Sequence, residues 1–448
     1  MIRFDRSRMR AGFGRDLVLD LLEGGFEAVD PKRCVREVLF RGGDRLRVGS
    51  TVFDMSERRV WTIAIGKAAV PMAEAVSERL GSALAGGVVV TRYGYGGPVE
   101  GLRVVEAGHP VPDENGLRGA RMIGELSDGV GPRDLVLCLL SGGGSALLSA
   151  PPEGVSIDDL AATTRLLLES GAAIDEINTV RRHLSTLQGG RLARRLRPAG
   201  VMTLVLSDVI GDHMEAIASG PTVPDPTTFD DAIGVLRRYL LWERLPSSVR
   251  DHLARGVAGE IAETPKPGDP AFQGTAAESI GDNGAFLDGL KQAARDAGYC
   301  VVRVSEPVIG EASAVGRGLG RRVMDLAVAA GRPTLLVAGG ETTVTVRGRG
   351  RGGRNQELAL AAALEIDGSD GVCVAALATD GSDGVTAAAG GIVDGLTAAS
   401  ARRAGIDPTA ALSDNDSHAA LTASGDLLLT GPTRTNVADA YVAYIDSA

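Results

Sequence analysis

The stretch Asp134-Leu-Val-Leu-Cys-Leu-Leu140, followed at once by Ser141-Gly-Gly-Gly-Ser145, decides the fold class of this chain of 448 residues. After Asp134 the run is apolar with no polar alternation, which is typical of a strand covered on both faces of a sheet. The glycine-rich turn then leads into a helical pattern, as at the strand–helix junctions of α/β enzymes. The sequence therefore predicts a buried parallel sheet with a ligand loop at one strand end.

Similar apolar runs alternate with helical patterns along most of the chain. The other predicted strands are Val60–Ile65, Gly87–Thr91, Arg103–Ala107, Val201–Leu206, Tyr299–Val304, Thr334–Ala338, Thr342–Arg347, Val372–Ala378 and Asp426–Leu429. The predicted helices include Ala68–Leu80, Leu117–Ser127, Ser156–Glu169, Ile177–Leu187, Asn283–Ala297, Ala312–Ala330, Asn355–Leu364 and Thr435–Ile445. This alternation predicts an α/β fold with two three-layer (αβα) domains, each on a mostly parallel, Rossmann-like sheet.

One stretch interrupts the alternation. Gly259–Gly274 contains Pro265, Pro267 and Pro270 among charged residues and has no apolar periodicity, which indicates a linker. We therefore expect an N-terminal domain at residues 1–270 and a C-terminal domain at residues 271–448. A cleft between two α/β domains is a common place for a ligand, so we expect the functional site in an interdomain cleft.

Composition excludes several classes of function. The net charge of −10 argues against a basic nucleic-acid-binding face, and no segment is apolar over the length of a membrane span. Apolar residues at 44% and charged residues at 23% are ordinary for a globular protein. Cys34, Cys138, Cys300 and Cys373 are far apart and form no CxxC, which argues against disulfides and structural zinc. We expect a cytoplasmic protein with small-molecule partners, and the oligomeric state stays open.

Two motifs follow predicted strands of the first half. Gly66-Lys67 places a lysine between a strand end and a helix start, beside which a phosphate oxygen can bind, although a solvated lysine is the alternative. No GxxxxGK[ST] is present, which argues against a P-loop fold. The second motif allows close backbone approach and offers consecutive N–H groups, so we expect it to bind an anion such as phosphate. Its residues are Ser141, Gly142, Gly143, Gly144 and Ser145.

A glycine- and arginine-rich motif lies in the second half. Gly348-Arg-Gly-Arg-Gly-Gly-Arg354-Asn355 contains GxGxxG between a predicted strand and a predicted helix, the pattern of a dinucleotide-binding turn. Its arginines, and the lack of a well-placed acid about 20 residues later, favour instead a flexible cationic loop for phosphates or a carboxylate. A loop that only contacts solvent is the alternative.

Acidic and polar residues complete the set of candidates. Carboxylates just past strand ends hold Mg²⁺ or accept a hydroxyl proton, but they also cap helices. The residues in question are Asp208 and Asp212 in the first half, and Asp380 and Asp383 in the second. Asn178 and Arg181, on a predicted helix, form a polar edge for a small anionic substrate, with a solvated helix face as the alternative.

Together these motifs resemble the class II glycerate kinases, with a glycerate-kinase N-terminal domain and a MOFRL C-terminal domain. The matching stretches run in order over nearly the whole chain: Gly66–Ala69, Gly108–Asp113, Ser141–Ser145, Asn178–Leu184, Leu206–Asp212, Ala218–Phe229, Gly339–Thr345, Gly352–Glu357, Ala378–Gly384, Asn415–Ser417 and Thr430–Thr433. The sequence departs from the family at four positions. Arg191 and Arg434 stand where glycine is frequent, and Val385 and Ala387 where proline and aspartate are common.

The resemblance implies ATP-dependent phosphorylation of D-glycerate on its 2-hydroxyl, giving 2-phosphoglycerate, with ATP and Mg²⁺ as cofactors. It implies that Lys67 and Arg354 are catalytic, and it adds Glu341 to the candidates for substrate binding or for the base. Asp380 and Asp383 are the candidate metal ligands. The four departures bear on substrate identity more than on reaction class. An NAD(P)H-dependent hydroxypyruvate reductase and a non-catalytic protein that binds a sugar acid or a nucleotide remain as alternatives.

Overall fold

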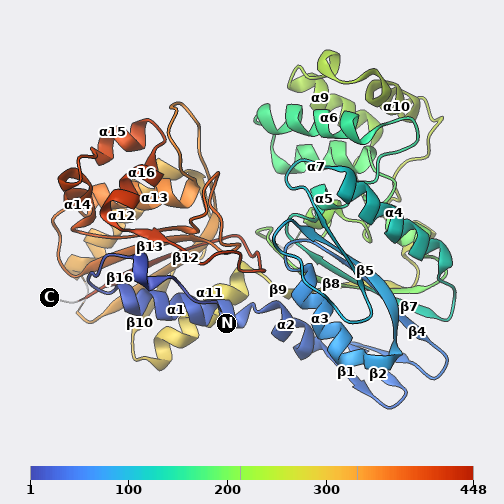
Figure 1. The fold of residues 1–448 in the computed structure, drawn as a ribbon, viewed down its shortest axis with the longest axis horizontal. Helices are drawn as coiled ribbons and strands as arrows, with labels where there is room; N and C mark the ends of the chain where they lie inside the picture. Colours follow the sequence, from blue (N-terminus) through green and yellow to red (C-terminus); the bar gives the residue numbers. More distant parts are fainter. Residues whose placement is uncertain (1, 212, 330, 447–448) are drawn as a thin grey trace. The chain divides into compact units, whose positions relative to one another are not determined.

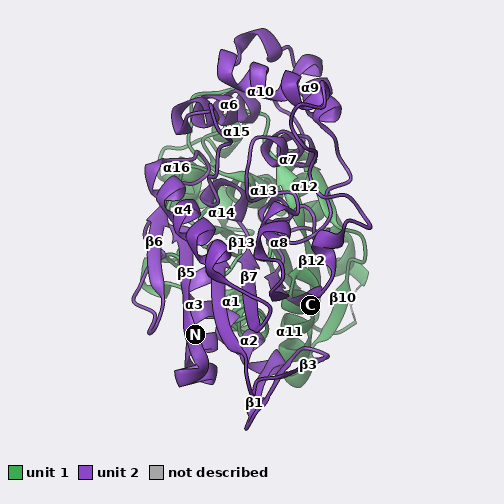
Figure 2. Ribbon diagram, turned by 90° about the vertical axis from the view of Figure 1, so that its right-hand side faces the viewer, with its two compact units in different colours: residues 1–30, 281–448 green, residues 31–280 purple. Residues whose placement is uncertain are grey.

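The computed structural model describes residues 2–211, 213–329 and 331–446. The chain forms two compact units (Figure 2): unit 1 is Met1–Asp30 with Gly281–Ala448, and unit 2 is Pro31–Ile280. This division differs from the expected one at residue 270 in two ways. The strand Thr275–Gly281 joins the sheet of unit 2, and the first 30 residues pack with the C-terminal part of the chain.

Unit 2 is built on a six-stranded sheet in the order β6-β5-β4-β7-β8-β9. Its strands are β4 (Arg59–Ile65), β5 (Leu84–Arg92), β6 (Arg103–Ala107), β7 (Asp134–Ser141), β8 (Gly200–Leu206) and β9 (Thr275–Gly281). The neighbours from β6 to β8 run parallel, as predicted. Every residue of β7 is buried, which explains its run of apolar residues without polar alternation.

Two groups of helices accompany this sheet. The core on the sheet includes residues of α4 (Glu114–Gly129), α5 (Gly144–Leu147) and α8 (Arg191–Leu196). The helix α3 (Ala69–Leu80) packs on β4, β5 and β7. A second group gathers at the upper right of Figure 1 around a core of its own that includes Val180, Phe229 and Leu253. Its helices are α6 (Ile157–Glu169), α7 (Ile174–His183), α9 (Phe229–Arg238) and α10 (Ser247–Val257).

Unit 2 also contains a small antiparallel sheet that the sequence analysis missed. It consists of β1 (Leu39–Gly42), β2 (Arg45–Val48) and β3 (Thr51–Asp54), and it follows α2 (Pro31–Val38). In β2 the buried Leu46 and Val48 alternate with exposed arginines. This alternation, with Gly42-Gly43 before it, is the hairpin signal that was available in the sequence.

Unit 1 is built on a mixed seven-stranded sheet in the order β10-β12-β16-β13-β14-β15, with β11 paired to β12. Its strands are β10 (Cys300–Arg303), β11 (Val308–Glu311), β12 (Thr334–Thr343), β13 (Val372–Ala378), β14 (Gly390–Asp394), β15 (Leu427–Leu428) and β16 (Asp439–Ile445). The expectation of a mostly parallel sheet is wrong for this unit, because β16 runs antiparallel to both its neighbours and β14 antiparallel to β13.

Two sequence predictions in unit 1 need correction. The expected helix Thr435–Ile445 is wrong, because its second part is the central strand β16, with all seven residues buried. A strand buried on both faces shows no polar alternation, so its apolar spacing was also compatible with a helix. The strand expected at Thr334–Ala338 continues through Gly339 and Gly340 as β12 and ends at Thr343. The second strand expected at Thr342–Arg347 is therefore wrong, because residues 344–347 form no strand.

Helices cover both faces of the unit 1 sheet (Figure 1). They are α1 (Arg15–Ala28) and α11 (Asn283–Asp296) on one face, and α12 (Ala312–Ala329), α13 (Arg354–Glu365), α14 (Thr397–Arg403), α15 (Pro408–Ser413) and α16 (Ser417–Ser424) on the other. Ala330, the expected end of α12, lies outside the described residues. The short 3₁₀ helices are Arg6–Arg8, Gly81–Ala83, Ile217–Ser219, Trp242–Arg244 and Pro270–Phe272.

The first helix, α1, belongs to unit 1 through close packing on α11. The rings of Phe26 and Phe286 meet edge to face with centroids 5.2 Å apart. A methyl group added to Gly25 would lie 2.8 Å from the Phe286 ring, so only glycine fits there. At the start of α1, Arg15 pairs with Asp394 at 2.9 Å and with Asp426 at 2.7 Å, all three side chains being buried. These contacts fix the N-terminal segment on unit 1.

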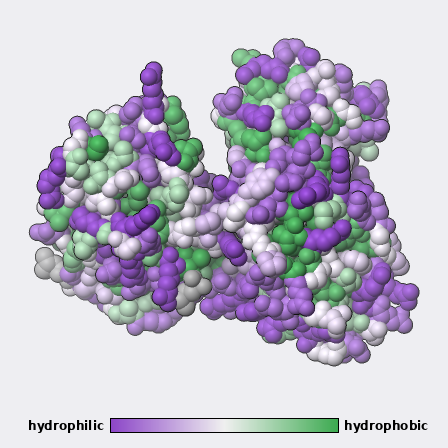
Figure 3. Space-filling view, in the orientation of Figure 1, coloured by the Kyte–Doolittle hydropathy of each residue, from purple (hydrophilic) through white to green (hydrophobic). Residues whose placement is uncertain are grey.

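The surface seen in Figure 3 is mostly hydrophilic, with small, separate hydrophobic areas. Across the described residues, every helix is too short or too polar to pass through a lipid bilayer.

Candidate active site

The candidate site of unit 2 lies where the chain reverses its direction across the sheet. From β4 the chain proceeds to β5 and β6 on one side, and from β7 to β8 and β9 on the other. Since β4 and β7 are parallel neighbours, the segments after their carboxyl ends lie side by side. Ligands of open α/β sheets bind at such a switch point. The structure therefore brings together Lys67 and the loop Ser141–Ser145, two of the predicted elements.

Direct contacts join these two segments. The backbone N–H of Lys67 donates to the carbonyl of Gly142 at 2.9 Å, and that of Ala68 donates to Ser141 Oγ at 3.0 Å. Gly66 has φ 126°, and a Cβ there would lie 2.2 Å from Ser141 Oγ, so this approach requires glycine. Lys67 itself is only 7% exposed. Its position is thus fixed by the loop on which we expect phosphate to bind.

The middle of the loop faces the Lys67 side chain. A Cβ built on Gly143 would lie 3.5 Å from Lys67 Cε and 3.2 Å from the ring of His109. Gly143 has φ 84°, a left-handed conformation that turns successive N–H groups toward one side. In the described part of the chain, the backbone N–H groups of Gly143 and Gly144 donate to no protein acceptor. Two such donors beside a lysine can bind an anionic oxygen.

Polar side chains of α7 continue the site from the far end of the loop. Ser219 Oγ lies 2.8 Å from Ser145 Oγ and 3.2 Å from Asn178 Oδ1, which also accepts from Arg181 Nη1 at 3.3 Å. Burial lowers the pKa of Arg181 to about 10, and no carboxylate among the described residues pairs with its guanidinium. Asn178 and Arg181 therefore lie beside the far end of the loop, with a positive charge available to an anion.

The acidic candidate of unit 2 follows the neighbouring strand. Asp208 comes two residues after the end of β8, which pairs with β7, and it is half-buried. Asp212 lies outside the described residues. Asp208 is therefore the acid of this pair that the structure describes. It follows β8, the neighbour of β7, which leads into the loop Ser141–Ser145.

The candidate site of unit 1 is centred on Arg354, the first residue of α13. Its Nε and Nη2 donate to the two carboxylate oxygens of Asp439 at 2.5 and 2.9 Å, and its Nη1 pairs with Glu341 at 2.7 Å. Burial raises the pKa of Asp439 to about 6, and the Arg354 guanidinium limits this rise. A guanidinium has five N–H donors, so two of them are left for a ligand.

These contacts give Glu341 a different place from the expected one. It was a candidate for binding substrate or for the base, but its carboxylate is engaged with Arg354. An ion pair at this distance orients the arginine. Asp439, which the sequence analysis missed, acts on Arg354 in the same way. No local signal could have found Asp439, because it lies 85 residues further along the chain and was expected in a helix.

The two acids expected to bind metal have other partners in the structure. Asp383 accepts the backbone N–H groups of Asn355 at 3.1 Å and Gln356 at 2.8 Å, so it caps the start of α13. Asp380 Oδ1 accepts the backbone N–H of Ser382 at 2.9 Å. Among the described residues, no three His, Cys, Asp or Glu side chains are grouped as a metal site. This geometry gives the expected metal assignment of Asp380 and Asp383 no support.

Replacing Asp383 by alanine is expected to lower the free energy of unfolding by about 1–2 kcal/mol, because the first turn of α13 loses its cap. Thermal denaturation with and without Mg²⁺ measures this change. We expect the same deficit under both conditions. If Mg²⁺ stabilised the natural chain and not the Asp383→Ala variant, the carboxylate would be a metal ligand and the capping role would be insufficient.

The structure also decides how the GxGxxG motif is used. The backbone N–H groups of Arg347 and Gly348 both donate to Asn415 Oδ1, at 2.7 and 3.0 Å, and that of Gly350 donates to the Asp414 carbonyl at 2.9 Å. A dinucleotide-binding turn directs such groups at the pyrophosphate. Here the protein itself uses them, so the motif is not a nucleotide cradle of that kind. The expected flexibility is also wrong, because these bonds hold the loop.

Two of the sequence's departures from the family have visible consequences. Arg434 has φ 58°, a left-handed conformation that explains why glycine is frequent at this position. Arg191 begins α8, and its Nη1 donates to the carbonyl of Arg182 at 2.6 Å. Burial lowers the pKa of Arg191 to about 10. Both arginines are thus accommodated by the fold.

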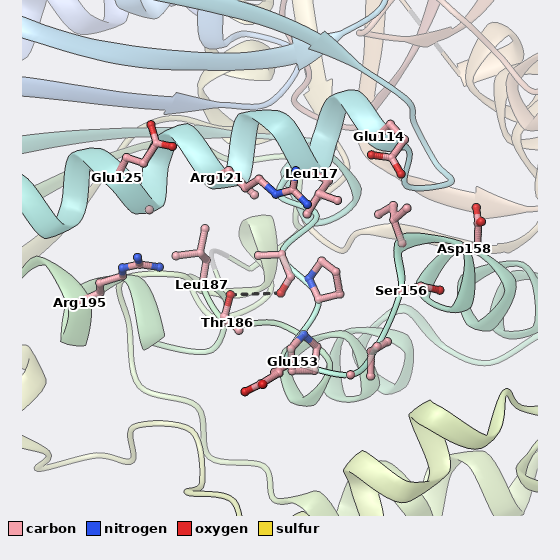
Figure 4. Close-up of a pocket in the computed structure, with 18 residues that line it drawn as sticks. Glu114, Leu117, Arg121, Glu125, Glu153, Ser156, Asp158, Thr186, Leu187 and Arg195 are labelled. Carbon is pink, nitrogen blue, oxygen red and sulfur yellow. Dashed lines mark hydrogen bonds between the residues drawn. The ribbon is translucent and has the colours of Figure 1, made fainter.

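A pocket of about 650 Å³ in unit 2 lies apart from these residues. Its walls are formed by α4, by the segment 150–158, by Thr186 and Leu187, and by α8 (Figure 4). Arg121 lines it from α4 and Arg195 from α8. Four carboxylates also line it: Glu114, Glu125, Glu153 and Asp158. The pocket includes neither Lys67 nor any residue of Ser141–Ser145, so it is not the candidate site.

Comparison with known proteins covers nearly the whole chain. The family model described as a domain of unknown function, DUF4147, matches residues 17–254, and the MOFRL family model matches residues 334–439. Glycerate 2-kinase of Pyrococcus horikoshii is 43% identical over 97% of this chain and 98% of its own length. The crystal structure of a glycerate kinase from Thermotoga maritima has a TM-score of 0.81 and 42% identity, covering 96% of this chain and 99% of that one.

Two relatives carry a different name. A putative hydroxypyruvate reductase of Agrobacterium vitis is 43% identical over 85% of this chain and 86% of its own length. The similarity therefore extends to proteins named for either of the two reactions considered from the sequence.

Proposed function

The chain belongs to the glycerate kinase family, and from this premise we propose that it transfers the γ-phosphoryl group of ATP to the 2-hydroxyl of D-glycerate. The observation that supports this most is the arrangement after β4 and β7. There the ammonium of Lys67 and the N–H groups of Gly143 and Gly144 lie at one point of the sheet. Phosphoryl transfer depends mainly on positioning and on neutralising phosphate charge, which such groups supply.

We assign the residues as follows. Ser141–Ser145 bind phosphate oxygens of ATP, while Lys67 and Arg354 stabilise the charge of the transferred group. Arg181 binds the glycerate carboxylate with help from Asn178, and Asp208 orients the 2-hydroxyl or accepts its proton. Glu341 and Asp439 hold Arg354 in place. Magnesium belongs to the proposal as part of the substrate MgATP, and no step is assigned to Asp380 or Asp383.

The compartment is part of the same proposal. None of the four cysteines forms a disulfide, and three of them are buried. Reduced cysteines are typical of proteins in reducing compartments, so we propose a cytoplasmic location.

The decisive test is the identity of the product. ³¹P NMR of a reaction of the protein with ATP, Mg²⁺ and D-glycerate separates the 2-phosphate from the 3-phosphate. We expect 2-phosphoglycerate and ADP. A parallel measurement of NAD(P)H absorbance with hydroxypyruvate tests the alternative that the Agrobacterium relative's name suggests. Oxidation of NAD(P)H without ATP turnover would replace the proposed function, and no reaction in either assay would leave a binding protein.

Replacing Arg181 by glutamine is expected to raise KM for D-glycerate by roughly 10- to 100-fold, because a charged hydrogen bond to the carboxylate is lost. KM for ATP should stay the same. Steady-state kinetics with each substrate varied in turn measure both values. Arg165→Gln, an exposed position on α6 of the same unit, is the matched control. An increase in KM for ATP instead would move Arg181 to the nucleotide.

A further inference from the structure

Residues 347–353 form a loop segment whose glycines and arginines face different surroundings. A Cβ added to Gly348 would lie 2.1 Å from the Asp414 carbonyl, one on Gly350 2.3 Å from Asp416 Cβ, and one on Gly352 2.2 Å from Ser417 Oγ. The glycine face is therefore pressed against the segment 414–417. The residue before each of these glycines is exposed: Arg347, Arg349 and Arg351. We call these three residues the arginine row.

Hydrogen bonds fix the backbone of this row. The N–H of Arg349 donates to Asp414 Oδ1 at 3.1 Å, and that of Arg351 donates to Asp416 Oδ1 at 3.0 Å. With the bonds to Asn415 and to the Asp414 carbonyl described above, every N–H from residue 347 to 351 has an acceptor. A segment held in this way loses little conformational freedom when a ligand binds.

The charges of the row are not neutralised by ion pairs. The aspartates beside it accept its backbone N–H groups from the glycine face, and within the described residues no carboxylate pairs with any of the three guanidinium groups. Single residues separate Arg347, Arg349 and Arg351, so the row presents three cations on one short segment. Three neighbouring cations suit a ligand with several negative charges better than the single carboxylate of a small hydroxy acid.

We propose that the arginine row binds the phosphate chain of a nucleoside triphosphate, an inference that rests on the proposed kinase function. A guanidinium group can bind two phosphate oxygens at once, and three guanidinium groups can neutralise the charge of consecutive phosphates. Val346 and Val385 are 74% and 75% exposed beside the row, and Arg351 Nη2 donates to the Val385 carbonyl at 3.5 Å. These aliphatic side chains offer apolar contact to a base or sugar, which inorganic phosphate does not need.

Asn415 is the positioning residue of the row. Its Oδ1 accepts two N–H groups of the segment, and its Nδ2 donates to Glu357 Oε2 at 3.1 Å on α13, one turn beyond Arg354. The side chain thus connects the row to the helix that carries Arg354. Asn415 has φ 54°, so Asn415→Gly removes these bonds and keeps the backbone conformation accessible.

The test is a variant in which Arg347, Arg349 and Arg351 are all replaced by glutamine. We expect KM for ATP to rise roughly 10- to 100-fold, with kcat and KM for D-glycerate unchanged. Inorganic tripolyphosphate is the probe for the phosphate chain. It should compete with ATP in the natural protein, and it should compete more weakly in the variant by a similar factor. Asn415→Gly should raise KM for ATP in the same direction, without a change in kcat.

The control removes equal charge elsewhere on unit 1. It replaces Arg317, Arg321 and Arg322 of α12 by glutamine, and KM for ATP should stay the same. If the natural protein phosphorylates D-glycerate and the triple variant of the row keeps its KM for ATP, the inference is overturned and the proposed function stands. A rise confined to KM for D-glycerate also overturns it. If the natural protein makes no phosphoglycerate, the proposed function fails, and calorimetric titration with MgATP still tests the row.

Discussion

Replacing Lys67 by methionine is expected to lower kcat/KM by about 10²–10³-fold, as the loss of one charge-stabilising group at a phosphoryl-transfer site typically does. Methionine retains the length and packing of the buried lysine stem but not the ammonium beside Gly143. The decrease should appear mainly in kcat, because the ammonium stabilises the transferred phosphoryl group most in the transition state, when its bond to ADP breaks. Coupled ADP-release kinetics at saturating D-glycerate measure it.

Two controls show whether the charge itself is responsible. Lys67→Arg restores a cation at the same position and should recover part of the lost rate. Lys291→Met, at a half-buried lysine of α11 in unit 1, should leave kcat/KM unchanged. A Lys67→Met variant with the rate of the natural protein would remove Lys67 from the catalytic residues, whatever the ³¹P spectrum shows.

The second large effect concerns stability as well as activity. Replacing Arg354 by alanine is expected to lower the free energy of unfolding by about 3–5 kcal/mol, because it leaves the buried Asp439 carboxylate without its cation. Chemical denaturation measures this loss, and initial rates on the folded fraction measure the accompanying loss of activity. The double variant Arg354→Ala/Asp439→Asn removes both charges, so it should recover stability without recovering activity.

The pH dependence of this deficit has a definite sign. Burial raises the pKa of Asp439 in the folded protein to about 6, above its value of about 3.9 in an unfolded chain. Without Arg354 the folded pKa rises further, so the variant loses stability as pH rises from about 4 toward that value. The deficit of Arg354→Ala should therefore be larger at pH 8 than at pH 5. An equal deficit at both pH values would mean that the Asp439 charge is not its source.

The sequence was sufficient to predict where Lys67 and the loop Ser141–Ser145 lie in unit 2, because both follow strand ends. The apolar runs of β4 and β7 mark where each strand stops, and Lys67 and the loop Ser141–Ser145 follow directly. Once both strands are placed in one parallel sheet, the two segments have to meet at its edge. The parallel pairing of β4 and β7, which the structure confirms, therefore places Lys67 and this loop next to each other.

The site of unit 1 could not be predicted in the same way. Arg354 is held by Asp439, and that contact depends on β16 entering the sheet between β12 and β13. The residues of β16 are apolar on both faces, so their spacing does not distinguish a strand from a helix. The role of the arginine row also depended on distant residues, since Asn415 and its neighbours determine which side of the segment faces solvent.

The membership of α1 in unit 1 has a consequence for the order of events during synthesis. This helix is synthesised before unit 2, whereas α11, against which Phe26 packs, is synthesised only after the roughly 250 residues of unit 2. At ordinary translation speeds that interval lasts roughly 12–50 s. During this interval the apolar face of α1 lacks its native partner α11. All strands of the six-stranded sheet of unit 2, in contrast, are synthesised before α11. Unit 2 can therefore fold during translation, whereas unit 1 can fold only after its second segment, residues 281–448, has been synthesised.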